Sequence, residues 1–193
     1  KMKNKALQKF EKTYNPEFSF LKEKGKLVDD WSNVYDHCYT EALVADVCVD
    51  IFKLNKFQRN NLVTAAILHD WYKRVERESA NKFGISQYEE KEKESEKLLV
   101  EYGYSPRVAY ITSCVGHLSL QKITESNDIV EMLMHVIDGM THGNKLVSLN
   151  ERMDQLEAAP RYKQLNESGR AVWNGRTFFE VQREVGNGII NGL

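Results

Sequence analysis

Apolar residues recur along most of this 193-residue chain at intervals of three and four positions, which is the period of an amphipathic α-helix. The segment from Asn61 to Lys73 is apolar on nearly every side, so it should form a central helix. No useful stretch alternates between apolar and polar residues as a strand does, and there is no internal repeat or linker. The pattern predicts one all-α domain, a helical bundle, with helices over residues 38–52, 61–73, 86–102, 106–116, 128–143, 148–158 and 161–185.

Local residues mark several of these boundaries. Gly103 can stop the helix that precedes it, and Ser105 with Pro106 forms a good cap and first-turn pair for the next one. That next helix should end near Gly116. The last predicted helix leads into the Gly/Asn-rich stretch "GNGIING" at 186–192.

Charge and composition narrow the class of protein. The chain has 27 Lys and Arg against 28 Asp and Glu, so it lacks the basic surface expected of a nucleic-acid-binding protein. No apolar run reaches membrane-spanning length, which predicts a protein that does not enter the membrane. The cysteines, Cys38, Cys48 and Cys114, form no C-x-x-C pair, and their odd number favours a reducing cytoplasm over a disulfide framework.

The stretch "AAILHDWYKR" at 65–74 places a histidine and a carboxylate at the end of an apolar run. An ionised carboxylate that leaves water is costly unless it is paired or bound to a metal. On a helix, His69 would point inward, Asp70 would lie at the edge of the same face, and Lys73 would follow one turn later. Spacing alone leaves two interpretations open: a metal site, or an Asp70 that forms an ion pair with Lys73 or Arg74.

Two local contexts resemble a known family. "NVYDHCYTEALVA", which contains His37, is similar to the N-V-x-E-H segment of nucleotidase-like members of the HD superfamily of metal-dependent phosphohydrolases, and "LVTAAILHDWYK" is similar to the apolar run and H-D-x-x-K of other members. The resemblance covers about residues 31–143, with a helical extension over 148–193. It implies an HD-type helical fold with one divalent metal ion held by His37, His69, Asp70 and Asp138.

Asp138 belongs to a polar stripe with Glu131, His135 and His142, on the side of its predicted helix opposite the apolar residues. This stripe is either a solvated face or the wall of a pocket. The family's final aspartate favours Asp138 as the ligand, with His135 as the substitute. His117 falls where members with two metals carry a further histidine, and it could instead bind phosphate or cap its helix.

The resemblance implies hydrolysis of the phosphate ester of a nucleotide or another small phosphorylated metabolite. Two imidazoles and two carboxylates suit Mn²⁺, Fe²⁺, Co²⁺, Ni²⁺ or Zn²⁺, with Mg²⁺ as a further option. We expect Asp70 and Lys73 to be catalytic, Asp70 as the candidate base, and Lys73, Arg74, Arg77 and His117 to bind substrate. The alternatives are a phosphodiesterase, a hydrolase of a triphosphate or alarmone, and a non-catalytic nucleotide-binding domain; a homodimer stays open.

Overall fold

Helices form nearly all of the regular structure in the computed structural model, which describes residues 5–25, 31–76, 78, 85–116 and 119–192. The α-helices bounded within these residues are α1 (Lys5–Thr13), α2 (Asn15–Lys24), α3 (Trp31–Ile51), α4 (Lys56–Leu68), α6 (Ile85–Glu101), α7 (Pro106–Thr112), α8 (Leu120–Glu125), α9 (Ile129–Gly139), α10 (Leu149–Ala158), α11 (Lys163–Val172) and α12 (Phe178–Gly192). A 3₁₀-helix, Pro160–Tyr162, precedes α11, and β1 (Thr141–His142) pairs with β2 (Lys145–Leu146) in an antiparallel hairpin. The prediction of an all-α, single-domain fold is confirmed.

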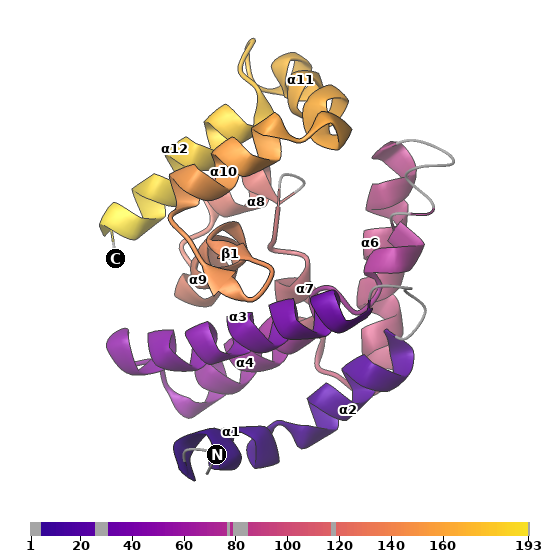
Figure 1. Ribbon diagram of the computed structural model, residues 1–193, viewed down its shortest axis with the longest axis vertical. Helices are drawn as coiled ribbons and strands as arrows, with labels where there is room; N and C mark the ends of the chain where they lie inside the picture. The colour runs from indigo at the N-terminus through magenta and orange to yellow at the C-terminus, as the bar shows by residue number, and fades with distance from the viewer. Residues whose placement is uncertain (1–4, 26–30, 77, 79–84, 117–118, 193) are drawn as a thin grey trace.

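Helices α3 and α4 pack along each other in the middle of the molecule (Figure 1). Asn55 fixes the start of α4, because its Oδ1 accepts hydrogen bonds from the backbone N–H groups of Phe57 and Gln58. All residues from Asn61 to Leu68 are buried, since α2, α3, α7 and α9 pack against this helix. The predicted central helix therefore exists, but it ends at Leu68, and residues 69–72 form turns where a further helical turn was predicted.

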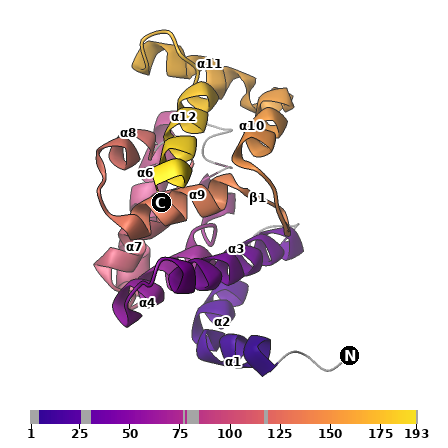
Figure 2. The same cartoon turned by 90° about the vertical axis from the view of Figure 1, so that its left-hand side faces the viewer.

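The remaining helices lie on two sides of this central pair. Helices α1 and α2 lie at one end of the molecule and α10, α11 and α12 at the other, in both views (Figures 1 and 2). The main core joins α1 to α4 with α6, α7 and α9. A smaller core under the C-terminal helices is built on Leu149, Met153 and Phe179.

Several of the predicted helices have the wrong extent. The helices predicted to begin at residues 38 and 61 begin at Trp31 and Lys56, and the one predicted to end near Gly116 ends at Thr112. The segment 161–185 is not one helix, because α11 and α12 are separated at Asn174 and Gly175, whose φ values of 52° and 87° no right-handed helix can contain. The stretch 186–192 is part of α12 instead of a tail after it. The helix predicted over 128–143 ends at Gly139 and gives way to the β1–β2 hairpin. No helix among the described residues is long and apolar enough to cross a lipid bilayer.

Candidate metal centre

Three helices bring four ligand-type side chains together at one point. His37 and Glu41 lie one turn apart on α3, His69 is the C-cap residue of α4, and Asp138 lies in the last turn of α9. One nitrogen or oxygen atom from each of these residues lies within 4.8 Å of the corresponding atom of every other. We call these side chains the four-residue cluster. Opposite ligands of one first-row ion, each about 2.1 Å from it, lie roughly 4 Å apart, so the cluster has the dimensions of a site for one ion.

Both histidines are oriented by backbone carbonyl groups. His69 Nδ1 lies 3.0 Å from the carbonyl oxygen of Ala66, and His37 Nδ1 lies 3.3 Å from that of Gly143 in the hairpin. A carbonyl oxygen only accepts hydrogen bonds, so each Nδ1 carries a proton and each Nε2 faces the cluster, where it can bind an ion once it is deprotonated. Metal-binding histidines are held in this way in other proteins.

Glu41 is the member of the cluster with the largest cost of desolvation, because it is a fully buried carboxylate. Its Oε1 lies 2.9 Å from His37 Nε2 and its Oε2 lies 3.4 Å from His69 Nε2. Neither oxygen accepts a well-oriented hydrogen bond from any described residue, and His69 Nε2 is likewise buried without a hydrogen-bond partner. A buried carboxylate facing two imidazole nitrogen atoms needs a positive charge between them. The four-residue cluster is therefore suited to bind a cation.

Asp70 adjoins the cluster on the turn after α4. Its Oδ1 lies 3.6 Å from His69 Nε2, and its Oδ2 lies 4.0 Å from His37 Nε2. The Lys73 ammonium donates a hydrogen bond to Asp70 Oδ1 over 2.7 Å. The structure thus brings together the predicted residues His37, His69, Asp70, Lys73 and Asp138. Asp70 forms an ion pair with Lys73 and also adjoins the four-residue cluster, so the ion-pair and metal-site interpretations of Asp70 do not exclude each other.

The electrostatic environment keeps the carboxylates ionised. Burial raises the pKa of Asp70, but the positive charges of Lys73 and of the two histidines lower it further, to well below its usual range. Burial also raises the pKa of Asp138, yet the hydrogen bond from His37 and the same positive charges bring it down to about 2. Burial lowers the pKa of His37, but the charge of Glu41 and the hydrogen bond to Asp138 raise it well above its usual value. The raised pKa of His37 reflects a strongly negative potential, which attracts cations.

The cluster is closed on one side and open on the other. The side chains of Glu41 and His69 are fully buried, whereas those of His37 and Asp138 are 13% and 22% exposed and that of Lys73 is 28% exposed. A small anion can therefore approach from the side on which Lys73 lies, while the inner ligands stay away from bulk water.

None of the other predicted site residues that the structure describes belongs to the four-residue cluster. Arg74 forms a salt bridge with Glu78, and Arg77 and His117 lie outside the described residues. The substitute ligand, His135, is buried away from the four-residue cluster, with its Nδ1 3.2 Å from the carbonyl oxygen of Cys114. Glu131 is buried and forms a salt bridge with Arg107. The polar stripe on α9 is therefore not a solvated face over most of its length.

Glu41 is the member of the cluster that the sequence reasoning missed. The signal was present, since Glu41 follows His37 by four residues, and residues at this spacing share one face of a helix. Its burial depends on how α4 and α9 pack against α3, which the spacing does not contain.

No protein-family model, curated protein or solved structure matches this chain. The site is therefore interpreted from its own geometry and chemistry.

Proposed function

We propose that this chain is a metal-dependent phosphohydrolase that cleaves the phosphate ester of a small metabolite, with nucleotides as the expected substrate class. One observation carries the proposal: two imidazole nitrogen atoms converge with the carboxylates of Glu41 and Asp138, and the fully buried Glu41 accepts no well-oriented hydrogen bond from any described residue. The ammonium of Lys73 lies beside the same cluster. A cation site bordered by a lysine suits an anionic substrate such as a phosphate ester.

The donor set narrows the choice of ion. Imidazole nitrogen suits Mn²⁺, Fe²⁺, Co²⁺, Ni²⁺ or Zn²⁺, whereas Mg²⁺ prefers oxygen ligands. His37, Glu41, His69 and Asp138 would hold this ion, with Asp70 as the adjoining carboxylate. When bound, a divalent ion supplies Lewis acidity to water and to the phosphoryl group.

The protein groups around the cluster have distinct tasks. Lys73 places a positive charge on the open side, where a non-bridging phosphate oxygen can take a charge-assisted hydrogen bond from it. The Asp70–Lys73 hydrogen bond holds that ammonium next to the cluster. Asp70 stays ionised, so its carboxylate can accept a hydrogen bond from an attacking water or contact the ion, although a pKa this far below its usual range makes it a weak base. His37 and His69 act as ligands, because their Nδ1 protons are already donated to the backbone.

The test is a hydrolysis assay of the purified chain loaded with Mn²⁺, Co²⁺ or Ni²⁺. We expect turnover of p-nitrophenyl phosphate and of at least one nucleoside monophosphate, and loss of both after EDTA treatment. Asp138→Asn should lower turnover at least tenfold, since it removes a charged ligand. Turnover of bis-p-nitrophenyl phosphate alone would instead identify a phosphodiesterase. Metal binding without turnover of any phosphate ester or anhydride would identify a binding domain and contradict the proposal.

A further inference from the structure

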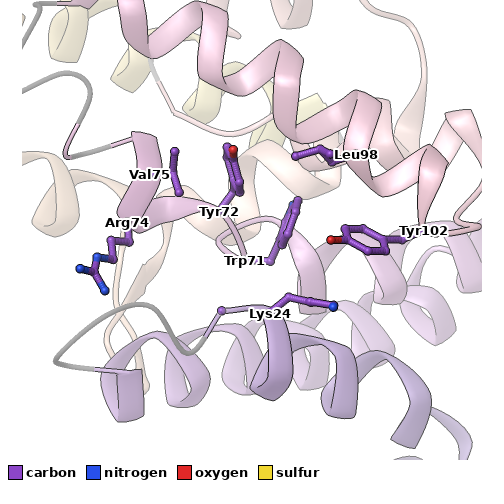
Figure 3. Close-up of a pocket in the computed structure, with 8 residues that line it drawn as sticks. Lys24, Trp71, Tyr72, Arg74, Val75, Leu98 and Tyr102 are labelled. Atoms are coloured by element: carbon purple, nitrogen blue, oxygen red, sulfur yellow. The ribbon is translucent and has the colours of Figure 1, made fainter.

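A pocket separate from the metal centre lies between the end of α2, the segment after His69 and helix α6 (Figure 3). Its volume is about 150 Å³, and no member of the four-residue cluster lines it. The aromatic part of its wall consists of Trp71, Tyr72 and Tyr102. We call it the aromatic pocket.

Hydrogen bonds outside the pocket hold two of these rings. The indole N–H of Trp71 donates to Ser95 Oγ over 2.8 Å, and the hydroxyl of Tyr72 donates to Glu94 over 2.8 Å. The rings of Trp71 and Tyr102 meet edge to face, with centroids 6.0 Å apart and planes at 89°. The aromatic wall is therefore fixed before any ligand arrives, which lowers the entropy cost of binding.

Aliphatic side chains complete the wall of the pocket, and the positively charged side chains of Lys24 and Arg74 lie at its edge. Leu98 and Val75 supply the apolar remainder. Lys24 Nζ lies 5.1 Å from the centroid of the Tyr102 ring, a cation–π contact. Figure 3 places Lys24 on one side of Trp71 and Arg74 toward another edge of the pocket. The nearby carboxylates of Glu94 and Glu78 accept hydrogen bonds from Tyr72 and Arg74.

We propose that the aromatic pocket binds a planar aromatic ring that carries an anionic group, the chemistry of a nucleoside monophosphate. A cavity of about 150 Å³ holds one aromatic ring the size of benzene, so one ring of a nucleobase can enter it while the rest stays outside. Aromatic side chains stack on all types of nucleobase. The ammonium of Lys24 at the rim of the pocket can bind a phosphate attached to the bound ring. Because none of the cluster residues lines this pocket, the proposal goes beyond the proposed hydrolysis and does not require a bound metal ion.

The position of the pocket in the chain links it to the metal centre. Trp71 and Tyr72 line the pocket, while the neighbouring residues Asp70 and Lys73 adjoin the four-residue cluster. One short segment therefore contributes to both sites.

The test is calorimetric titration of the EDTA-treated 193-residue chain with AMP, adenosine and ribose 5-phosphate. We expect AMP to bind with a saturable isotherm and a Kd at least tenfold lower than those of the two partial probes, because neither combines ring and charge. Tyr102, about half exposed, is the safest wall residue to change. Tyr102→Ala should raise the Kd for AMP roughly 5- to 150-fold, the range measured for loss of a stacking ring.

Matched lysine variants separate this pocket from general charge effects. Lys24 and Lys22 lie on the same helix and each contacts a tyrosine ring, but Lys22 faces Tyr35 away from the pocket. Lys24→Met should raise the Kd for AMP about tenfold or more, and Lys22→Met should leave it within twofold. The proposal is overturned if AMP shows no saturable binding in the millimolar range, if ribose 5-phosphate binds as tightly as AMP, or if both lysine variants behave alike.

Discussion

The side chain of Glu41 decides the chemistry of the cluster. His37, His69 and Asp138 could form an ordinary hydrogen-bonded group, because two of them are partly exposed. A fully buried carboxylate among them, which accepts no well-oriented hydrogen bond from a described residue and lies 2.9 Å from His37 Nε2, requires a positive charge close by. Removing the charge of Glu41 should therefore weaken metal binding.

Glu41→Gln keeps the shape of the side chain and removes its charge. We expect the Kd for Mn²⁺ to rise at least tenfold, because a neutral amide is a weaker ligand. The metal-free variant should differ little in stability from the metal-free wild type, since glutamine keeps the shape of the side chain and removes both the desolvation cost of the carboxylate and its ion pair with His37. Metal titration and urea unfolding of both proteins measure these two effects.

Asp50→Asn is the matched control, because Asp50 lies on the same helix but its side chain is 77% exposed. It should leave the Kd for Mn²⁺ unchanged. Equal metal affinity in the Glu41 variant and the wild type would exclude Glu41 from the site.

Lys73→Met tests the proposed phosphate contact without touching a ligand, since a protonated lysine has no lone pair for a metal. The variant should keep its metal, while kcat/KM falls by roughly ten- to two-hundredfold through loss of a charge-assisted hydrogen bond. Steady-state kinetics and metal analysis of one preparation give both results. Lys97→Met, at a lysine 78% exposed on α6, is the control. Near-wild-type kcat/KM in the Lys73 variant would mean that Lys73 only forms an ion pair with Asp70.

The sequence predicted three of the four cluster residues but not the reason for the burial of the fourth. His37, His69 and Asp138 were predicted through the family resemblance, and their side chains do meet. Glu41 was missed because helical spacing places it beside His37 without indicating whether that face is solvated. Burial of a single carboxylate depends on the packing of three helices, which no local pattern encodes.

At the scale of elements, the β1–β2 hairpin supports the four-residue cluster from outside. Its turn passes through Gly143, whose φ of 60° is costly for other residues and whose carbonyl accepts the Nδ1 proton of His37. Gly143→Ala should destabilise the protein by about 1 kcal/mol and raise the Kd for Mn²⁺ up to about tenfold, because the strained turn displaces that carbonyl. Urea unfolding and metal titration measure the two changes.

Gly188→Ala provides the comparison, since Gly188 lies in α12, has no positive φ, and faces open space where an alanine methyl group would stand. This change should stabilise the helix slightly and leave metal binding unaltered. Identical metal affinities in the Gly143 variant and the wild type would mean that the hairpin does not orient His37.

The start of α7 was easier to predict from the sequence than the interruptions of helices. Ser105 and Pro106 begin α7 as predicted, and Ser105 Oγ accepts a hydrogen bond from the backbone N–H of Val108. These signals are local, because a cap and the amide that it binds are three residues apart. The hairpin had a local signal too, the Gly143–Asn144 pair, but apolar periodicity outweighed it. The break between α11 and α12 at Asn174 was not predicted, because the apolar residues on both sides of it keep helical spacing.

At the scale of the whole molecule, a buried histidine makes stability depend on pH. Burial lowers the pKa of His135, although the carbonyl of Cys114 and the charge of Asp138 partly oppose this. Because the folded pKa lies below the unfolded one, the unfolded chain gains a proton first as pH falls, and stability is lost below about pH 6.5. This loss proceeds by up to about 1.4 kcal/mol per pH unit.

His135→Asn isolates that contribution, because asparagine can still donate to the Cys114 carbonyl but does not titrate. The difference in unfolding free energy between the metal-free wild type and variant should shrink as pH falls from about 7.5 to about 5.5. Urea unfolding at both pH values measures it. A constant difference would mean that His135 takes up a proton as readily when folded as when unfolded.

The central claim is that the four-residue cluster holds one divalent ion, and metal analysis tests it most directly. The full chain, incubated with Mn²⁺ and passed through gel filtration, is measured by elemental analysis alongside its thermal unfolding with and without the ion. We predict about one ion per chain and a Tm that rises with ion concentration, because an ion that binds only the folded state stabilises it. A folded chain that retains no Mn²⁺, Co²⁺, Ni²⁺ or Zn²⁺ and whose Tm none of them raises would contradict this claim.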